Sequence, residues 1–174
     1  MLSQPRQNLA ILKSNFAYAV IFEDDVSFDS AHLKNTISEL IINKKEWDIC
    51  TLDTVCDTVV PIKKLDDNQQ LVIYLGRPCL SSAYLVNRKA ARNLIKKALP
   101  IKMPLDHYFF RGWELDVKFT GVFPSPIHQT FGNSEMGSIF PTLAGNPINK
   151  FLYKTSSVIL NFTHLTKEFL KSTY

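Results

Sequence analysis

The apolar residues at the start of the chain change from helical to strand-like spacing. The first of them lie at helical intervals, at Leu9, Leu12 and Phe16. This spacing predicts an opening helix, and the continuous apolar run 17–22 that follows predicts a buried strand. Asp29 or Ser30 can cap a second helix. The buried stripe of that helix is expected at Leu33, Ile37, Leu40 and Ile41.

The middle of the chain carries short apolar segments with the length of strands, at residues 48–52, 71–75 and 83–86. The polar stretch 57–70 between the first two is rich in turn-forming residues, so we expect an excursion without a strand there. Asn87 can cap the next helix, and Pro100 ends it. The spacing therefore predicts strands alternating with helices.

The last third of the chain is less regular. Pro104 suits the first turn of a short helix through residues 106–110, and the alternation of apolar and polar residues over 115–120 predicts a half-buried strand. Residues 124–147 are expected to form an extended surface excursion. A final amphipathic helix has its apolar positions at Val158, Phe162, Leu165 and Phe169. The whole pattern indicates an α/β fold in a single domain over residues 1–174.

Composition places the chain among globular proteins. It is 45% apolar and 21% charged, which excludes an intrinsically disordered protein. Cys50, Cys56 and Cys79 form no CxxC pair, so neither a disulfide framework nor a zinc site is expected, and a reducing compartment fits better. The first apolar run is too short for a membrane span, and acids follow it where a signal peptide would have its cleavage site. No glycine pattern supports a kinase or a dehydrogenase.

The charges are unevenly distributed along a chain whose net charge is +4. Residues 88–102 contain six cations and no acid, and a second basic segment lies near the C-terminus. Two interpretations remain open: contact with an anionic membrane surface or phosphorylated glycolipid, or simply a solvated helix face. Nucleic acid is not an expected partner, because the acids gather where the first strand ends.

Three adjacent acids, Glu23, Asp24 and Asp25, follow the first buried strand directly. In open α/β sheets, ligands bind at the carboxyl ends of the strands. If the pleat continues, Glu23 and Asp25 point to one side and Asp24 to the other, so two carboxylates can share a Mg²⁺ or Mn²⁺ ion. The alternative is a solvated loop, or acids that cap the following helix.

Four motifs in order resemble glycosyltransferase family 25, which includes bacterial lipooligosaccharide galactosyltransferases. They are residues 18–26 (YAVIFEDDV), 82–91 (SAYLVNRKAA), 103–110 (MPLDHYFF), and 126–129 (PIHQ) followed by 133–139 (NSEMGSI). The resemblance implies a GT-A-like sheet flanked by helices and an inverting hexosyltransferase, most simply a galactosyltransferase. Its donor is a UDP-sugar such as UDP-galactose, and its acceptor a lipooligosaccharide or lipopolysaccharide core. We therefore expect a cytoplasmic protein in peripheral contact with the anionic inner membrane.

The resemblance also implies roles for individual residues. Asp25, with Glu23 or Asp24, would hold Mn²⁺ or Mg²⁺ at the diphosphate of the donor. Asp106 is the candidate base for the acceptor hydroxyl, although it could instead stabilise its helix or bind metal or donor sugar. Donor contacts are expected at Glu23, Asp24, Gln129, Asn133, Ser134 and Ser138. His107, His128, Arg88 and Lys89 are further candidates for contact with phosphate or sugar, each with an ordinary structural role as the alternative.

One departure from the family pattern bears on activity. The family begins with a strand and a helix that help hold the nucleotide, and Ser3-Gln4 stands where a Ser-His pair is expected. We therefore expect an N-terminally incomplete domain that binds UDP-sugar poorly unless another segment or partner completes it. The alternatives from other classes are a non-catalytic remnant of such an enzyme and a metal-dependent phosphohydrolase.

Overall fold

The computed structural model describes residues 4–53, 56, 58–75, 82–100 and 105–129, together with seven helical residues nearer the C-terminus, at 155, 159, 160, 162, 163, 166 and 167. The helices are α1 (Gln4–Lys13), α2 (Ser30–Ile42), α3 (Arg88–Ala98), α4 (Leu105–Phe110) and α5 (Gly112–Leu115). The strands are β1 (Tyr18–Phe22), β2 (Val26–Phe28), β3 (Ile49–Thr51), β4 (Val59–Lys64), β5 (Gln70–Tyr74), β6 (Ala83–Asn87), β7 (Phe119–Phe123) and β8 (Ile127–Gln129).

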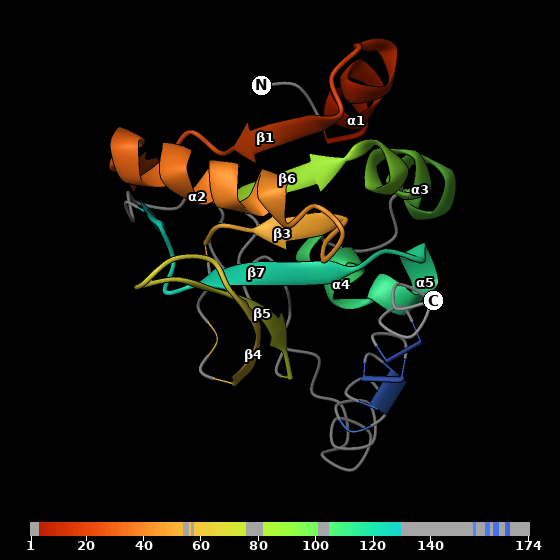
Figure 1. The fold of residues 1–174 in the computed structure, drawn as a ribbon. Helices are drawn as coiled ribbons and strands as arrows, with labels where there is room; N and C mark the ends of the chain where they lie inside the picture. Colours follow the sequence, from red (N-terminus) through yellow and green to blue (C-terminus); the bar gives the residue numbers. More distant parts are fainter. Residues whose placement is uncertain are drawn as a thin grey trace.

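Six of the strands form one mixed sheet in the order β1-β6-β3-β7-β5-β4. β3 and β7 are parallel, whereas β6 is antiparallel to both of its neighbours, β1 and β3. The arrowheads of β1, β3 and β7 therefore point the same way, and β6 points the opposite way (Figure 1). β2 and β8 pair as a separate antiparallel ribbon. The α/β class predicted from the sequence is confirmed.

Helices cover both faces of the sheet, because side chains of its strands alternate between two hydrophobic clusters. In β6, Ala83 and Leu85 pack with Leu33 and Leu40 of α2. Tyr84 and Val86 face the other way, into a cluster with residues of α1, α3, α4 and α5. α2 accordingly lies in front of the sheet in Figure 1, and α4 lies behind it. The central strands β3 and β6 are thus buried between two helical layers.

The helix starts predicted from single capping residues are confirmed. Asp29 caps α2, its carboxylate accepting a hydrogen bond of 2.7 Å from the backbone N–H of His32. Asn87 caps α3 by accepting from the N–H of Ala90 at 2.8 Å. In both cases a side-chain oxygen satisfies an N–H that has no partner inside the helix.

The expected excursion over 57–70 is wrong in its central part. Residues Val59–Lys64 form β4, which pairs with β5 at the edge of the sheet. The register shifts between Pro61 and Lys63, which is consistent with a proline that has no N–H to donate to the ladder. An edge strand keeps much of its surface in water and tolerates lysine and proline, so its polarity concealed it.

The strand expected over 115–120 is also displaced. Leu115, Val117 and Phe119 are all buried in one cluster, as their alternation predicts. However, Leu115 ends α5 and Asp116 adopts a left-handed conformation with φ of 55°, so the strand begins only at Phe119. A helix end followed by a left-handed turn therefore produced the same burial pattern as a strand.

Two further predictions need correction. Ile41 is 41% exposed, and the third fully buried position of α2 is instead Thr36, whose hydroxyl donates a hydrogen bond of 2.7 Å to the buried side-chain amide oxygen of Gln69.

The excursion expected over 124–147 contains β8, and its residues from 130 onward lie outside the described ones. In the predicted last helix, Phe162 is helical and 58% exposed, whereas Val158, Leu165 and Phe169 lie outside the described residues.

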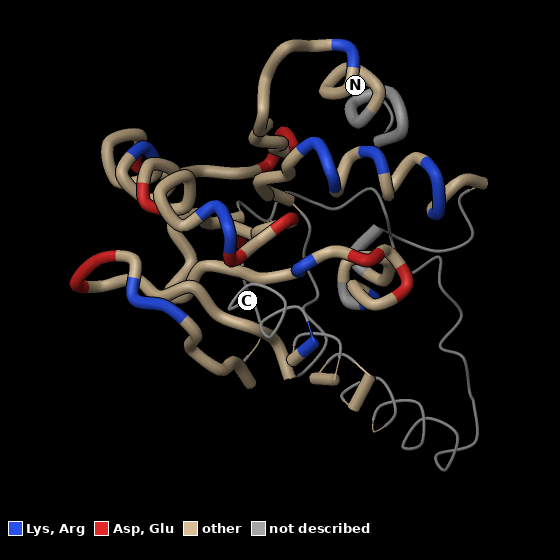
Figure 2. Tube along the Cα trace, turned by 45° about the vertical axis from the view of Figure 1, so that its right-hand side comes forward, with Lys and Arg blue, Asp and Glu red and all other residues tan. Residues whose placement is uncertain are grey.

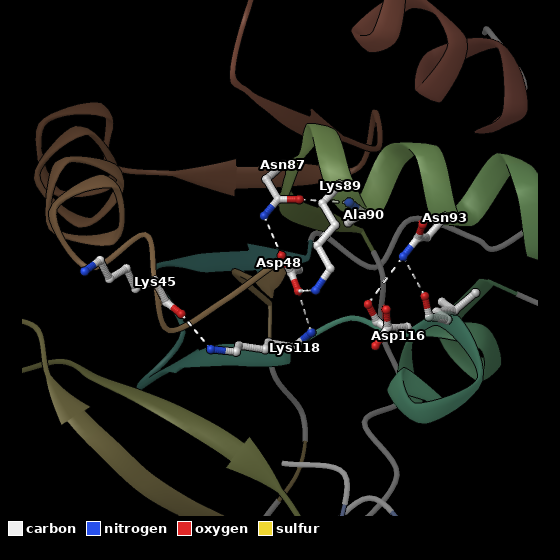
Figure 3. Close-up of polar contacts among 9 residues, drawn as sticks. Lys45, Asp48, Asn87, Lys89, Ala90, Asn93, Asp116 and Lys118 are labelled. Carbon is white, nitrogen blue, oxygen red and sulfur yellow. Dashed lines mark hydrogen bonds and ion pairs between the residues drawn. The ribbon is translucent and has the colours of Figure 1, made fainter. Parts of the chain in front are cut away.

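A buried carboxylate fastens the edge of the sheet where β6 ends and β3 and β7 begin. Asp48 is 7% exposed and accepts hydrogen bonds from the side chains of Asn87 (2.7 Å) and Lys89 (2.8 Å) and from the backbone N–H of Lys118 (2.9 Å) (Figure 3). Each carboxylate oxygen is thus paired, and the contact joins three segments that are distant in sequence. This network anchors α3 to the sheet.

Replacing Asp48 by alanine should lower the free energy of unfolding by about 2 to 4 kcal/mol, because the Lys118 N–H and the Asn87 amide lose a buried acceptor. Urea denaturation followed by circular dichroism measures this change. The control is Asp67→Ala, which removes only an exposed ion pair with Lys64 and should change stability by less than about 0.5 kcal/mol. A loss of equal size in the two variants would contradict the anchoring role.

Candidate functional site

The acids that follow β1 lie at the C-terminal ends of β1 and β3, where β6 begins. Asp48 lies at the opposite ends of these strands. Ser82 precedes β6 and lies between the two strand ends. Its carbonyl accepts from the backbone N–H of Glu23 at 2.7 Å, and its own N–H donates to the carboxylate of Asp53 at 2.9 Å. Neighbouring strands are about 4.8 Å apart, so Glu23 and Asp53 are brought within two strand spacings.

The acidic triplet has the alternation of exposure that its pattern predicted. Glu23 and Asp25 are half-buried, whereas Asp24 is exposed. The pKa of Glu23 is raised, first by burial and then by the negative charges of Asp25, Asp53 and Asp24. The three neighbouring charges therefore act on Glu23, as expected for carboxylates that lie in one site.

The β2–β8 ribbon brings Gln129 to the triplet from a distant part of the chain. In that ribbon Val26 pairs with Gln129. The amide nitrogen of Gln129 donates to Oδ2 of Asp25 at 2.7 Å, and its Oε1 is buried with no hydrogen-bond partner among the described residues. The structure thus places Gln129 in the predicted site, in contact with the acid that was predicted to bind metal.

Asp53 is the acid of this site that the sequence analysis did not single out. It follows β3 and is 2% exposed. Its Oδ2 accepts hydrogen bonds from both the backbone N–H and the hydroxyl of Ser82, whereas Oδ1 is buried with no partner in the described part of the chain. Burial raises the pKa of Asp53, and the bonds from Ser82, together with the nearby backbone N–H groups of Asp53 and Ala83, only partly offset that increase.

A signal for Asp53 was present in the sequence. Like Glu23, it follows a short strand, in this case the fully buried β3, and the carboxyl ends of such strands are common ligand sites. What the sequence does not reveal is that β6 inserts between β1 and β3. The two acids are 30 residues apart in the numbering, and only this pairing makes them neighbours.

The remaining predicted site residues have different outcomes. Asp106 lies in α4, whose Tyr108 and Phe109 pack on the same face of the sheet as Ile21 and Ile49, but its side chain is outside the described ones. Residues 133, 134 and 138 also lie outside the described part. His128 is exposed on β8, next to Gln129.

Arg88 and Lys89 lie at the other end of the strands from the acids, and both have the structural partners that were the alternative to phosphate contact. The guanidinium of Arg88 donates to backbone carbonyls at the end of α1, including those of Leu12 at 2.9 Å and Ser14 at 2.6 Å. Lys89 forms the ion pair with Asp48. Both cations therefore fasten helices to the sheet, at the edge opposite the acids.

The side chains of this site can supply only some of the ligands that a hard cation needs. Among the described residues, no group of three or more His, Cys, Asp or Glu side chains is placed to hold a metal ion. Mg²⁺ and Mn²⁺ are, however, often held by one or two carboxylates, with substrate phosphates and water as the other ligands. Carboxylates that repel one another, beside the unsatisfied Oε1 of Gln129, fit such a site.

Asp53→Asn should stabilise the protein at neutral pH. The amide oxygen keeps both bonds from Ser82, while the cost of a buried charge disappears. Because the folded-state pKa of Asp53 lies above its ordinary value of 3.8, wild-type stability falls as pH rises from that value through the folded pKa.

The stability advantage of Asp53→Asn over the wild type should therefore be absent near pH 3.5 and grow toward pH 8. Urea unfolding at several pH values in EDTA measures it, with Asp67→Asn as the matched exposed control. An advantage that shrinks with rising pH would show that the carboxylate is stabilised in its charged form.

Comparison with known proteins gives one family. Glycosyltransferase family 25 (LPS biosynthesis protein) matches residues 9–109, more than half of the 174 residues. The match includes the acidic triplet, Asp53 and Ser82, and it confirms the family that the motifs resembled. Among curated proteins, no sequence matches the chain.

Proposed function

Because the chain belongs to glycosyltransferase family 25, we propose that it transfers a hexose from a UDP-sugar to a lipooligosaccharide or lipopolysaccharide core, with inversion at the anomeric carbon. Galactose from UDP-galactose is the first donor to test. The observation that carries the proposal is the convergence of Glu23, Asp25 and Asp53 at the carboxyl edge of the sheet, with Gln129 bonded to Asp25. Such an edge is where α/β proteins bind nucleotides.

The residues proposed to hold Mn²⁺ or Mg²⁺ are Asp25 and Glu23, with Asp24 as a donor contact. A divalent ion bound there supplies charge neutralisation at the departing diphosphate. The chain itself orients the ligands: Gln129 fixes Oδ2 of Asp25, and Ser82 fixes the backbone of Glu23. Held in this way, the carboxylate of Asp25 loses little rotational freedom when a ligand binds.

Asp106 is proposed as the base that takes the proton of the acceptor hydroxyl while the oxygen bonds to the anomeric carbon. Its helix α4 covers the face of the sheet toward which Ile21 and Ile49 point. Two and four residues further along their strands, Glu23 and Asp53 share that face if the pleat continues. Gln129, Asn133, Ser134 and Ser138 are proposed to complete the contacts to the donor.

The proposal predicts Mn²⁺-dependent binding of UDP. Isothermal titration with UDP at high protein concentration, with and without Mn²⁺, should show weak affinity with the ion, as expected above for this chain, and none without it. Asp25→Asn should weaken it by about 10- to 100-fold, because the amide keeps the bond with Gln129 but loses the charge. Asp67→Asn is the matched control and should bind as the wild type does.

The two alternative functions, a phosphohydrolase and a non-catalytic remnant, predict different results when the same purified protein is assayed. A phosphohydrolase would release phosphate from nucleotides without an acceptor. A non-catalytic remnant would show no transfer from UDP-galactose to truncated lipooligosaccharide, even with Mn²⁺. Metal-independent UDP binding would contradict the role of the acids.

We also propose that α3 brings a cytoplasmic enzyme to the anionic inner membrane that carries the acceptor. Neither α1 nor α3 contains an acid, and Arg92, Lys96 and Lys97 of α3 are exposed. Figure 2 shows basic positions along this helix. Basic side chains near an anionic surface each contribute about 1 kcal/mol of binding. In the described residues, no helix has the length and apolarity needed to cross a bilayer.

Vesicles that contain phosphatidylglycerol should bind the protein, and neutral phosphatidylcholine vesicles should not. Replacing Arg92, Lys96 and Lys97 by glutamine should reduce binding by on the order of 100-fold in co-sedimentation. Glutamine at the exposed Lys34, Lys44 and Lys45, in and after α2, is the matched control. Equal losses in both triple variants would show attraction by net charge alone.

A further inference from the structure

Asp53 has the features of a ligand-binding group more than those of a structural one. A buried carboxylate that serves only the fold has both oxygens paired, as Asp48 does at the other edge. Asp53 is more deeply buried than Asp48, at 2% against 7% exposed, yet only its Oδ2 is bonded. Among the described residues it forms no ion pair, and Oδ1 has no hydrogen-bond donor.

The position of Oδ1 is fixed because the rest of the Asp53 carboxylate is held by hydrogen bonds. Two bonds from Ser82 hold the other oxygen, and Ser82 is itself bonded to the backbone of Glu23. The charge of Asp53 acts on Glu23, so this carboxylate belongs to the acidic site and not to a separate part of the core. Leaving a buried acceptor unpaired costs stability, and a hydrogen-bond donor brought by a ligand would recover that cost.

We propose that Oδ1 of Asp53 accepts a hydrogen bond from a hydroxyl group of the nucleotide sugar, and that Ser82 is the residue that positions it. The inference rests on the proposed function, and it names a contact that orients the donor. A hydroxyl suits this oxygen because it brings the hydrogen-bond donor that Oδ1 lacks among the described residues, whereas the metal is proposed at Asp25 and Glu23. The hydroxyl can come from the ribose or from the hexose.

The test compares wild type, Asp53→Asn and Asp67→Asn by titration with Mn²⁺ alone, with UDP, and with UDP-galactose in Mn²⁺. Asp53→Asn keeps the bonds from Ser82 and loses the charged acceptor. If the hexose supplies the hydroxyl, affinity for UDP-galactose falls about tenfold or more while affinity for UDP is unchanged. If the ribose supplies it, both affinities fall together. In either case binding of Mn²⁺ alone stays within twofold of the wild type.

Simple electrostatics predicts the opposite result, because removing a negative charge should strengthen binding of an anionic diphosphate. Unchanged or tighter binding of UDP and UDP-galactose would therefore overturn the proposal while leaving the proposed function intact. Loss of Mn²⁺ binding would also overturn it, by making Asp53 a metal ligand. If the wild type itself shows no Mn²⁺-dependent UDP affinity, the proposed function fails as well.

Deoxy analogues of the donor identify the hydroxyl. For the analogue that lacks the bonded group, Asp53→Asn should cause no further loss, since both changes remove the same contact. Ser82→Ala should weaken the same ligand in the same pattern but less, because the backbone N–H of residue 82 still holds Oδ2. Additive losses with every analogue would rule out a direct bond.

Discussion

The insertion of β6 between β1 and β3 is the constraint on which the candidate site depends. β6 runs antiparallel to both neighbours, so the residue that precedes it, Ser82, lies beside the residues that follow them. The main-chain bond from Glu23 to Ser82 and the bond from Ser82 to Asp53 continue this pairing past the ends of the strands. A different strand order would separate these acids, whatever the local sequence around each one.

Polar groups have different roles at the two ends of the central strands. At one end Asp48 has its oxygens paired, and Arg88 donates to several carbonyls of the α1 end, so the charges there fasten helices. At the other end, burial and the charges of Asp25, Asp53 and Asp24 raise the pKa of Glu23, and an oxygen of Asp53 lacks a partner among the described residues. Such an arrangement costs stability, and natural proteins tolerate that cost mainly at functional sites.

Much of the fold was predictable because its signals are local. The caps at Asp29 and Asn87 and the strand before Glu23 depend on a few adjacent residues, and each was found where expected. The expected burial of that strand is wrong, because β1 lies at the edge of the sheet and only its Ile21 is buried. β4 was missed because an edge strand is largely exposed, and the start of β7 because a helix end imitated strand alternation. In each error the local pattern was real, but more than one backbone conformation satisfies it.

The sequence alone determined the class of the protein and the acids after the first strand, because strand periodicity, capping and motif order are properties of neighbouring residues. Only the tertiary structure decided the composition of the site. It added Asp53 and Ser82, placed Gln129 against Asp25 across 104 positions, and removed Arg88 and Lys89 to the far edge. The physical reason is that strand order and ribbon pairing are set by long-range packing of the whole sheet, which no short stretch of sequence specifies.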